Sequence, residues 1–186
     1  MSLAGLVLAS GRSERFGRQD KLLAMLNGKP LLAHCLENVQ GAGFDDVFMV
    51  CPDPDPRADL ARRLGFKVIP NPDPQTGQGA SIALGASFLL AKGYDSVCII
   101  LGDMPFISSR YFKEIQETPG DIVFSRANDK DQPPAIFRGN ALRALTQLSK
   151  DRGAKSLDLS SFEITLMDLP PEMSVDFDTE EDFKAV

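Results

Sequence analysis

The chain has 186 residues, of which 43% are hydrophobic and 25% are charged, a balance typical of a globular protein with a substantial core. Its formal net charge of −6 and the lack of an extended basic patch argue against nucleic acid or an anionic membrane as a partner. No apolar run approaches the roughly 20 residues that cross a bilayer, and the amino terminus lacks the features of a secretory signal. We therefore expect a cytoplasmic protein with a single domain, residues 1–186.

The expected elements alternate along the chain between short apolar strands and longer segments of helical period. Strands are expected at residues 6–8, 47–51, 67–69, 97–101, 121–124, 135–137 and 163–166. Helices are expected at 30–39, 56–64, 78–92, 109–116 and 139–148, and a last helix is expected after Thr179. Gly65 and Gly93 are suited to closing two of these helices. Apolar strands that alternate with helices predict an α/β fold with three layers and a doubly wound, mostly parallel sheet.

The three cysteines, Cys35, Cys51 and Cys98, are widely spaced, and each has apolar neighbours. Their odd number and the absence of a CxxC pair argue against a disulfide framework. We expect buried, reduced thiols that act as small hydrophobic side chains.

The segment that follows the first expected strand, from Ala9 to Lys21, is rich in glycine and in cationic residues. Such a loop lies where ligands bind in α/β sheets, because glycine lets backbone N–H groups approach phosphate oxygens and cations neutralise their charge. The spacing matches neither a P-loop nor the GxGxxG fingerprint. These residues alone leave a solvated surface loop as the alternative.

A family resemblance extends over a longer pattern, Leu8-Ala9-Ser10-Gly11-Arg12-Ser13-x-Arg15-Phe16-Gly17-x-x-Asp20-Lys21, followed by Gly28-Lys29-Pro30-Leu31. This pattern resembles the amino-terminal motif of the MobA/MocA-like molybdenum-cofactor nucleotidyltransferases. The resemblance implies the Rossmann-like fold of the nucleotide-diphospho-sugar transferases and a loop that wraps an NTP. It implies nucleotide-binding roles for Leu8, Ala9, Ser10, Gly11, Arg12 and Ser13, and catalytic roles on the phosphates for Arg15 and Lys21. Ser10 stands where the family usually has glycine or alanine.

Two acidic segments suggest a metal site. Asp103 emerges from the end of a buried strand, where a carboxylate can hold Mg²⁺, although a simple turn aspartate would look the same. Asp176 and Asp178 share one face if their segment is extended, although an acidic lead into a capped helix is the alternative. Both segments resemble the family's metal motifs. The resemblance implies that Asp103 and Asp178 hold Mg²⁺ and that Gly102 lies at the nucleotide.

The implied mechanism needs no strong general base, because an acceptor phosphate is already anionic near neutral pH. Mg²⁺ on Asp103 and Asp178 would stabilise the charge that develops at the α-phosphorus, with Asp103 counted among the catalytic residues. Arg15 and Lys21 would offset the charge of the departing pyrophosphate. His34, the only histidine, is expected to be structural or exposed.

The segment from Gly77 to Gly85 resembles the cytidylyltransferase branch of the family, which adds Gly79 and Ser81 to the nucleotide-binding residues and favours CTP over GTP. Residues 132–137 and 151–157 resemble the family's stretches near the acceptor, although Pro133 stands where many relatives have histidine.

We therefore expect a Mg²⁺-dependent enzyme that transfers CMP from CTP to molybdopterin cofactor and releases pyrophosphate. Alternatives are the use of GTP with the same acceptor, and transfer to another small phosphate such as a sugar or polyol phosphate. A nucleotide-binding module without turnover is the alternative outside enzymes, and it should have lost Asp103 or Asp178.

Overall fold

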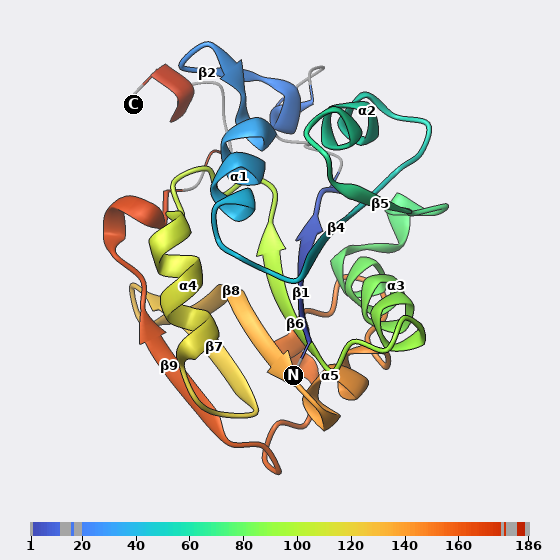
Figure 1. Cartoon of the computed structure of the whole chain (residues 1–186), viewed down its shortest axis with the longest axis vertical. Helices are drawn as coiled ribbons and strands as arrows, with labels where there is room; N and C mark the ends of the chain where they lie inside the picture. The colour runs from blue at the N-terminus through green and yellow to red at the C-terminus, as the bar shows by residue number, and fades with distance from the viewer. Residues whose placement is uncertain (1, 12–15, 17–19, 176, 178–181, 185–186) are drawn as a thin grey trace.

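A computed structural model of the chain describes residues 2–11, 16, 20–175, 177 and 182–184 (Figure 1). Its centre is a seven-stranded sheet with the order β5-β4-β1-β6-β8-β7-β9. The strands are β1 (Leu3–Leu8), β4 (Asp46–Cys51), β5 (Lys67–Pro70), β6 (Ser96–Leu101), β7 (Ile122–Ala127), β8 (Lys130–Arg138) and β9 (Ile164–Asp168). All seven expected strands are thus confirmed.

The helices connect the strands much as the sequence predicts. They are α1 (Leu31–Gln40), α2 (Pro56–Arg63), α3 (Gln78–Ala91), α4 (Ser109–Glu117) and α5 (Asn140–Leu145). Short 3-10 turns are η2 (Lys21–Leu23), η3 (Pro74–Thr76), η4 (Ala154–Ser156), η5 (Pro171–Met173) and η6 (Asp182–Lys184), and a small hairpin pairs β2 (Met25–Leu26) with β3 (Lys29–Pro30). Gly65 and Gly93 follow α2 and α3 with positive φ angles of 86° and 87°, which suits their predicted role at the helix ends.

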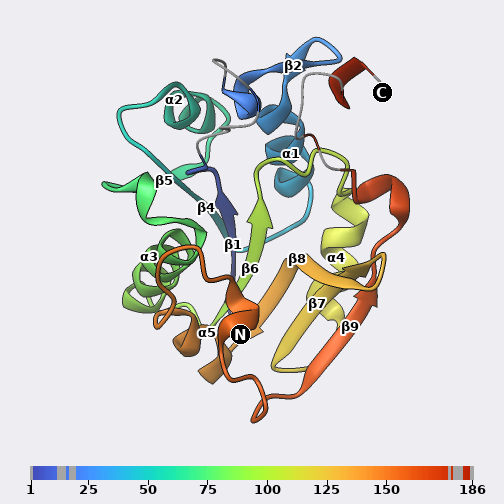
Figure 2. The same cartoon turned by 180° about the vertical axis from the view of Figure 1, so that it is seen from behind.

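The sheet is covered on both faces, so the predicted three-layer arrangement is confirmed. Successive residues of β1 point to opposite faces: Val7 packs in the layer of α1, α2 and α4, whereas Leu6 and Leu8 pack in the layer of α3 and α5. Figure 1 shows α1 and α4 in front of the sheet, and Figure 2 shows the opposite side, with α3 and α5. None of the helices in the described ranges is long and apolar enough to cross a membrane.

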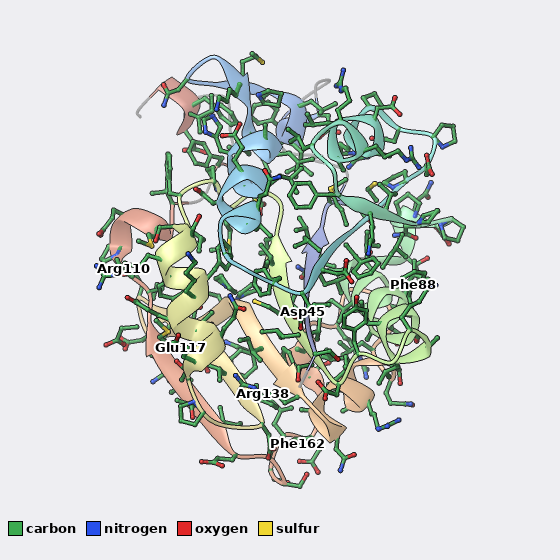
Figure 3. All side chains as sticks on the ribbon, in the orientation of Figure 1. Asp45, Phe88, Arg110, Glu117, Arg138 and Phe162 are labelled. Carbon is green, nitrogen blue, oxygen red and sulfur yellow. The ribbon has the colours of Figure 1, made fainter. Side chains whose placement is uncertain are left out.

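The sheet is parallel except at β8, which runs antiparallel to both β6 and β7. β7 and β8 form a hairpin whose turn residues, Asn128 and Asp129, both have positive φ angles, 50° and 59°. Arg138, near the end of β8, donates hydrogen bonds to the carbonyl oxygens of Gln116, Thr118 and Gly120 at the end of α4 (Figure 3). These bonds satisfy the carbonyl of Gln116, in the last turn of the helix, and two carbonyls of the turn that follows it.

Three expectations differ from the structure in extent. β8 begins at Lys130 rather than at residue 135, and α5 ends at Leu145, short of residue 148. The last expected helix is described only at 182–184, where the backbone forms a 3-10 turn; its expected start, residues 179–181, lies outside the described residues.

Candidate functional site

The candidate site lies at the carboxyl ends of β1 and β6, which are neighbours in the sheet. In the sheet, β4 and β5 lie beyond β1 on one side, whereas β8, β7 and β9 lie beyond β6 on the other side. Ligands of doubly wound sheets bind at such a switch point. Gly102 joins the ends of the two strands, because its N–H donates to the Leu8 carbonyl oxygen at 3.0 Å. Figures 1 and 2 show the turns η2 and η6 at this same end of the molecule.

A cation and a carboxylate meet at this edge although they lie far apart in the sequence. The Lys21 Nζ lies 2.8 Å from Asp103 Oδ2, and the two side chains are 12% and 34% exposed. Asp20 starts the turn η2 by accepting a hydrogen bond from the Leu22 N–H, which fixes the backbone at Lys21. The structure therefore brings together two of the residues that the sequence predicts as catalytic.

The predicted nucleotide-binding residues Ser10 and Ser81 are joined by a residue that the sequence analysis missed. Asn71 follows β5, and its side-chain NH₂ donates to the hydroxyls of Ser10 at 3.0 Å and of Ser81 at 3.1 Å. Its backbone N–H donates to the Cys51 carbonyl oxygen at 2.8 Å. Asn71 could have been found from its position, since it directly follows a parallel strand at the ligand-binding edge. Asn71 thus joins the amino-terminal loop and the first turn of α3 in one nearly buried polar cluster.

Leu8 and Ala9 occupy the end of β1 at the floor of the site. Ala9 donates its N–H to the Val50 carbonyl oxygen at 2.9 Å, and the Ser10 hydroxyl donates to the same oxygen at 3.2 Å. Both residues are buried, as is Leu8. The start of the loop is thus fixed against β4.

The three glycines predicted at the nucleotide differ in what surrounds them. A Cβ on Gly79 would lie 2.3 Å from the Arg152 carbonyl oxygen, and one on Gly102 would lie 3.2 Å from the Leu8 carbonyl oxygen. Packing within the chain therefore already accounts for these two glycines. A Cβ on Gly11 would meet no atom of the described residues within 4 Å, so packing among these residues gives no reason for glycine there.

A second residue that the sequence analysis missed is Arg57, a buried side chain on α2. Its guanidinium donates to the carbonyl oxygens of Ala9 and Gly11 and also lies beside Asp20. An arginine on a helix rich in charged residues gives no sequence signal of burial, because such residues are usually solvated.

Four predicted site residues, Arg12, Ser13, Arg15 and Asp178, lie outside the described residues, as does Asp176. Phe177, between the two aspartates, is 1% exposed and packs against Phe106, with ring centroids 5.6 Å apart. Phe106 lies three positions after Asp103, so the chain at Phe177 passes close to the turn that carries the predicted metal ligand. Within the described residues, no group of three or more His, Cys, Asp or Glu side chains could hold a metal ion.

A cavity of about 210 Å³ lies on the α3 side of the sheet, next to this edge. The two stretches predicted near the acceptor both contribute to its wall, through Gln132–Pro133 and through Gly153–Lys155. At its rim, Asp131 accepts a hydrogen bond from Arg126 at 2.8 Å, and its other oxygen lies 4.0 Å from the Lys155 Nζ. The rest of the lining is largely apolar: Ile82, Ile99, Leu101, Phe124, Ala135 and Phe137.

The prediction of buried, free cysteine thiols is confirmed. All three belong to the core layer beneath α1, α2 and α4. Burial raises the pKa of each thiol, that of Cys51 to about 12.

Comparison with known proteins connects this geometry to a family. Residues 5–163 match the family described as the MobA-like NTP transferase domain. The chain is 33% identical over 108 residues to a probable molybdenum cofactor guanylyltransferase of Thermococcus gammatolerans, an overlap of 56% of this chain and 50% of that protein. The protein of the same name from Thermococcus kodakarensis is 32% identical over 140 residues, 73% of this chain and 59% of that one. The alignments therefore span about half to three-fifths of these relatives.

Solved structures share the fold. The crystal structure of Rv0371c from Mycobacterium tuberculosis aligns with a TM-score of 0.81 at 23% identity, covering 100% of this chain and 96% of that one. Molybdopterin-guanine dinucleotide biosynthesis protein A from Archaeoglobus fulgidus aligns with a TM-score of 0.71 at 21% identity, covering 98% and 95% of the two chains.

The comparisons agree with the predicted family but not with the finer prediction of its cytidylyltransferase branch, because these sequence relatives are named guanylyltransferases. The family match covers most of the chain, including the end of β1, the amino-terminal loop and Asp103. This chain therefore belongs to the family of the MobA-like NTP transferase domain.

Proposed function

We propose that this chain is a metal-dependent nucleotidyltransferase that transfers a nucleoside monophosphate from an NTP to the phosphate of molybdopterin cofactor. The observation that carries the proposal is the Lys21–Asp103 pair at the switch point of the sheet. In the strand order, the polar cluster of Ser10, Asn71 and Ser81 lies toward β5, and the largely apolar cavity lies toward β8 and β7. This arrangement suits a reaction that joins a nucleotide to a second, less polar molecule.

The proposed reaction is an in-line displacement. An oxygen of the acceptor phosphate forms a bond to the α-phosphorus, and the bond from that phosphorus to the bridging oxygen breaks, so that its electron pair leaves with pyrophosphate. Lys21 is proposed to offset the negative charge of the phosphates. Its contact with Asp103 holds the ammonium group at the edge of the sheet before a nucleotide binds.

Asp103, together with Asp178, is proposed to hold Mg²⁺, which when bound neutralises phosphate charge and polarises the reacting phosphoryl group. The partly exposed Asp103 carboxylate fits this role, since Mg²⁺ prefers one or two carboxylates and keeps several waters. Rv0371c, whose fold this chain shares, has also been crystallised in complex with manganese.

Two nucleoside triphosphates, GTP and CTP, have support as the source of the transferred nucleotide. The names of the sequence relatives favour GTP, and the pattern from Gly77 to Gly85, with serine at position 81, favours CTP. In either case we propose that the base lies against the polar cluster of Ser10, Asn71 and Ser81. The donors of this cluster already bond within the chain, so it offers the base hydroxyl oxygens as acceptors and a fixed wall to pack on.

For the acceptor, the lining of the cavity favours a heterocycle over a sugar. Apolar side chains such as Phe124 and Phe137 would leave the hydroxyl groups of a sugar without hydrogen-bond partners, which is costly. Gln132 and Asp131 offer polar contacts for the edge of a pterin, and Lys155 offers a cation for its phosphate.

The test is pyrophosphate release from GTP, CTP, ATP and UTP with Mg²⁺, with and without molybdopterin cofactor. We expect acceptor-dependent release with GTP or CTP. Asp103→Asn should lower kcat/KM by about 10²- to 10³-fold, the usual loss when an electrostatic catalytic group is removed. The matched control is Asp95→Asn, just before β6 at its opposite end, which should leave the rate unchanged.

Each outcome separates the alternatives. Release with a sugar phosphate but not with molybdopterin cofactor would refute the proposed acceptor. Nucleotide binding without release under any condition would point to the non-catalytic module. A wild-type rate in Asp103→Asn would remove Asp103 from the mechanism.

A further inference from the structure

The guanidinium of Arg57 is surrounded by acceptors from three separate segments of the chain. Its Nη1 donates to the carbonyl oxygens of Ala9 at 2.9 Å and of Gly11 at 3.0 Å. Its Nε and Nη2 donate to the two carboxylate oxygens of Asp55 at 2.8 and 3.0 Å. The Nε also lies 3.1 Å from Asp20 Oδ2. Arg57 thus contacts both the start and the end of the loop between β1 and η2.

From this geometry we infer that Arg57 is a positioning residue for nucleotide binding, which holds both ends of the loop 9–20 in the arrangement that receives the phosphates. The inference rests on the proposed function, because it assigns Arg57 to the same site. Arg57 itself lies behind the loop and is 8% exposed, so it acts through the residues that it holds.

The contacts at the start of the loop orient its peptide groups. In a trans peptide, the carbonyl and the following N–H point in opposite directions. Because the Ala9 carbonyl points toward Arg57, the N–H of Ser10 points away from it. A backbone N–H that points out of such a loop and away from a cation is suited to bind phosphate oxygens.

The contact at the end of the loop acts on Lys21. Arg57 pairs with Asp20, and Asp20 fixes the turn η2 through the Leu22 N–H. Lys21 is the first residue of that turn, and its ammonium group reaches Asp103. A shift of Asp20 would therefore move the predicted phosphate-binding cation, and displacements near 1 Å in an active site can cost about 100-fold in rate.

The burial and full pairing of the Arg57 guanidinium fit a positioning role better than a purely stabilising one. A buried, fully paired charge contributes little net stability, and apolar side chains of similar volume often replace such groups without loss. The planar guanidinium instead offers five donors in a fixed arrangement, which can hold two carbonyls and two carboxylates at once. Lysine cannot reproduce this arrangement, because its single ammonium group lacks the fork.

The experiment compares Arg57→Met and Arg57→Lys with the wild type. The matched control is Arg62→Met, on the same helix, whose side chain pairs with Asp53 and Asp59 on the exposed side of α2. The first measurement is the Kd of a fluorescent NTP analogue with Mg²⁺, which needs neither acceptor nor turnover. The second is the separate determination of KM for the NTP and of kcat, and the third is urea unfolding.

We expect Arg57→Met to raise both Kd and KM at least about tenfold, the range expected when hydrogen bonds to charged groups are lost. Arg57→Lys should give intermediate values, and Arg62→Met should stay within about twofold of the wild type. An unchanged Kd and KM in Arg57→Met, with only a lower urea midpoint, would overturn the inference. If Arg57→Met does not fold, a wild-type Kd in Arg57→Lys would overturn it in the same way.

A double-mutant cycle with Asp20→Asn tests the proposed route. If Arg57 acts through Asp20, the two changes should be clearly less than additive in their effects on Kd; full additivity would overturn this part of the inference. Wild-type protein that binds NTP but releases no pyrophosphate would refute the proposed function alone, since the Kd comparison does not depend on turnover.

Discussion

At the scale of single residues, charge near the site is balanced by pairing. Asp55 begins α2 as its N-cap and accepts hydrogen bonds from the Arg57 backbone N–H and from the guanidinium. These bonds hold the pKa of the Asp55 carboxyl below its ordinary value. Since the folded pKa is the lower one, the ionised form is favoured by folding. Its contribution to stability is present above the unfolded pKa, about 4, and is lost as the pH falls through the folded pKa.

Asp55→Asn should therefore destabilise the protein in a pH-dependent manner. Asparagine keeps a good N-cap but loses the charge, so we expect a loss of about 1–3 kcal/mol in the free energy of unfolding near neutral pH. Urea unfolding at several pH values should show this difference shrinking in acid, below the folded pKa. Asp59→Asn, an exposed change in the first turn of the same helix, is the control. A difference that stays constant with pH would contradict the linkage.

The residues that sequence analysis missed are those whose role depends on burial. Arg57 and Asn71 are both polar and look like surface residues in the sequence, yet each is 8% exposed. Lys21 and Asp103 were predictable because a motif marks them, although their contact across the sheet edge was not. Gly79 and Gly102 were predicted as nucleotide contacts, but close packing within the chain provides a reason for glycine at both positions.

At the scale of elements, a cluster of aromatic rings joins segments that are distant in the sequence. Phe16 in the amino-terminal loop packs on Phe183, with ring centroids 5.1 Å apart. Phe183 packs on Phe177 at 4.9 Å, and Phe177 packs on Phe106 at 5.6 Å. The cluster links the loop, the turn after β6 and the carboxyl-terminal segment on one side of the candidate site.

Phe183→Ala should weaken nucleotide binding as well as stability. It removes two ring contacts worth about 0.5–1.5 kcal/mol each, and one of them supports the amino-terminal loop. Urea unfolding and the Kd of a fluorescent NTP analogue are the two measurements. Phe162→Ala is the control, since Phe162 lies at the opposite end of the molecule (Figure 3). Equal effects of the two changes on Kd would argue against a role for the cluster in binding.

Element positions were predictable where the sequence has a continuous apolar run, as in β1 and β6. The extension of β8 was not, because Lys130–Gln132 and the two following prolines resemble a loop. Pairing with β7 through the turn at Asn128 and Asp129 gives this polar segment its strand conformation. The pairing is a tertiary effect, and tertiary context readily overrides local preference in strands.

At the scale of the whole molecule, burial by two helical layers isolates the interior of the sheet from solvent. All three cysteines lie in one of these layers, and each is at most 1% exposed. Burial raises their pKa values, so little thiolate forms near neutral pH and reagents have no access.

A thiol-specific reagent should therefore modify none of the cysteines in the native protein at mildly alkaline pH within minutes. After unfolding in urea, three thiols per chain should react. Rapid reaction of a thiol in the native state would show that this layer opens locally.

The contact between α3 and the segment 150–152 limits where new loop sequence can be introduced into the chain. Gly77 and Gly79 approach that segment so closely that added Cβ atoms would collide with its backbone, and the Ala80 N–H donates to the Lys150 carbonyl oxygen. An insertion there would displace the first turn of α3, and with it Ser81. The cavity wall at Gly153–Lys155 begins just after this contact. A loop exchange intended to change the second substrate should therefore start after Arg152, where new sequence can be introduced without moving the nucleotide side.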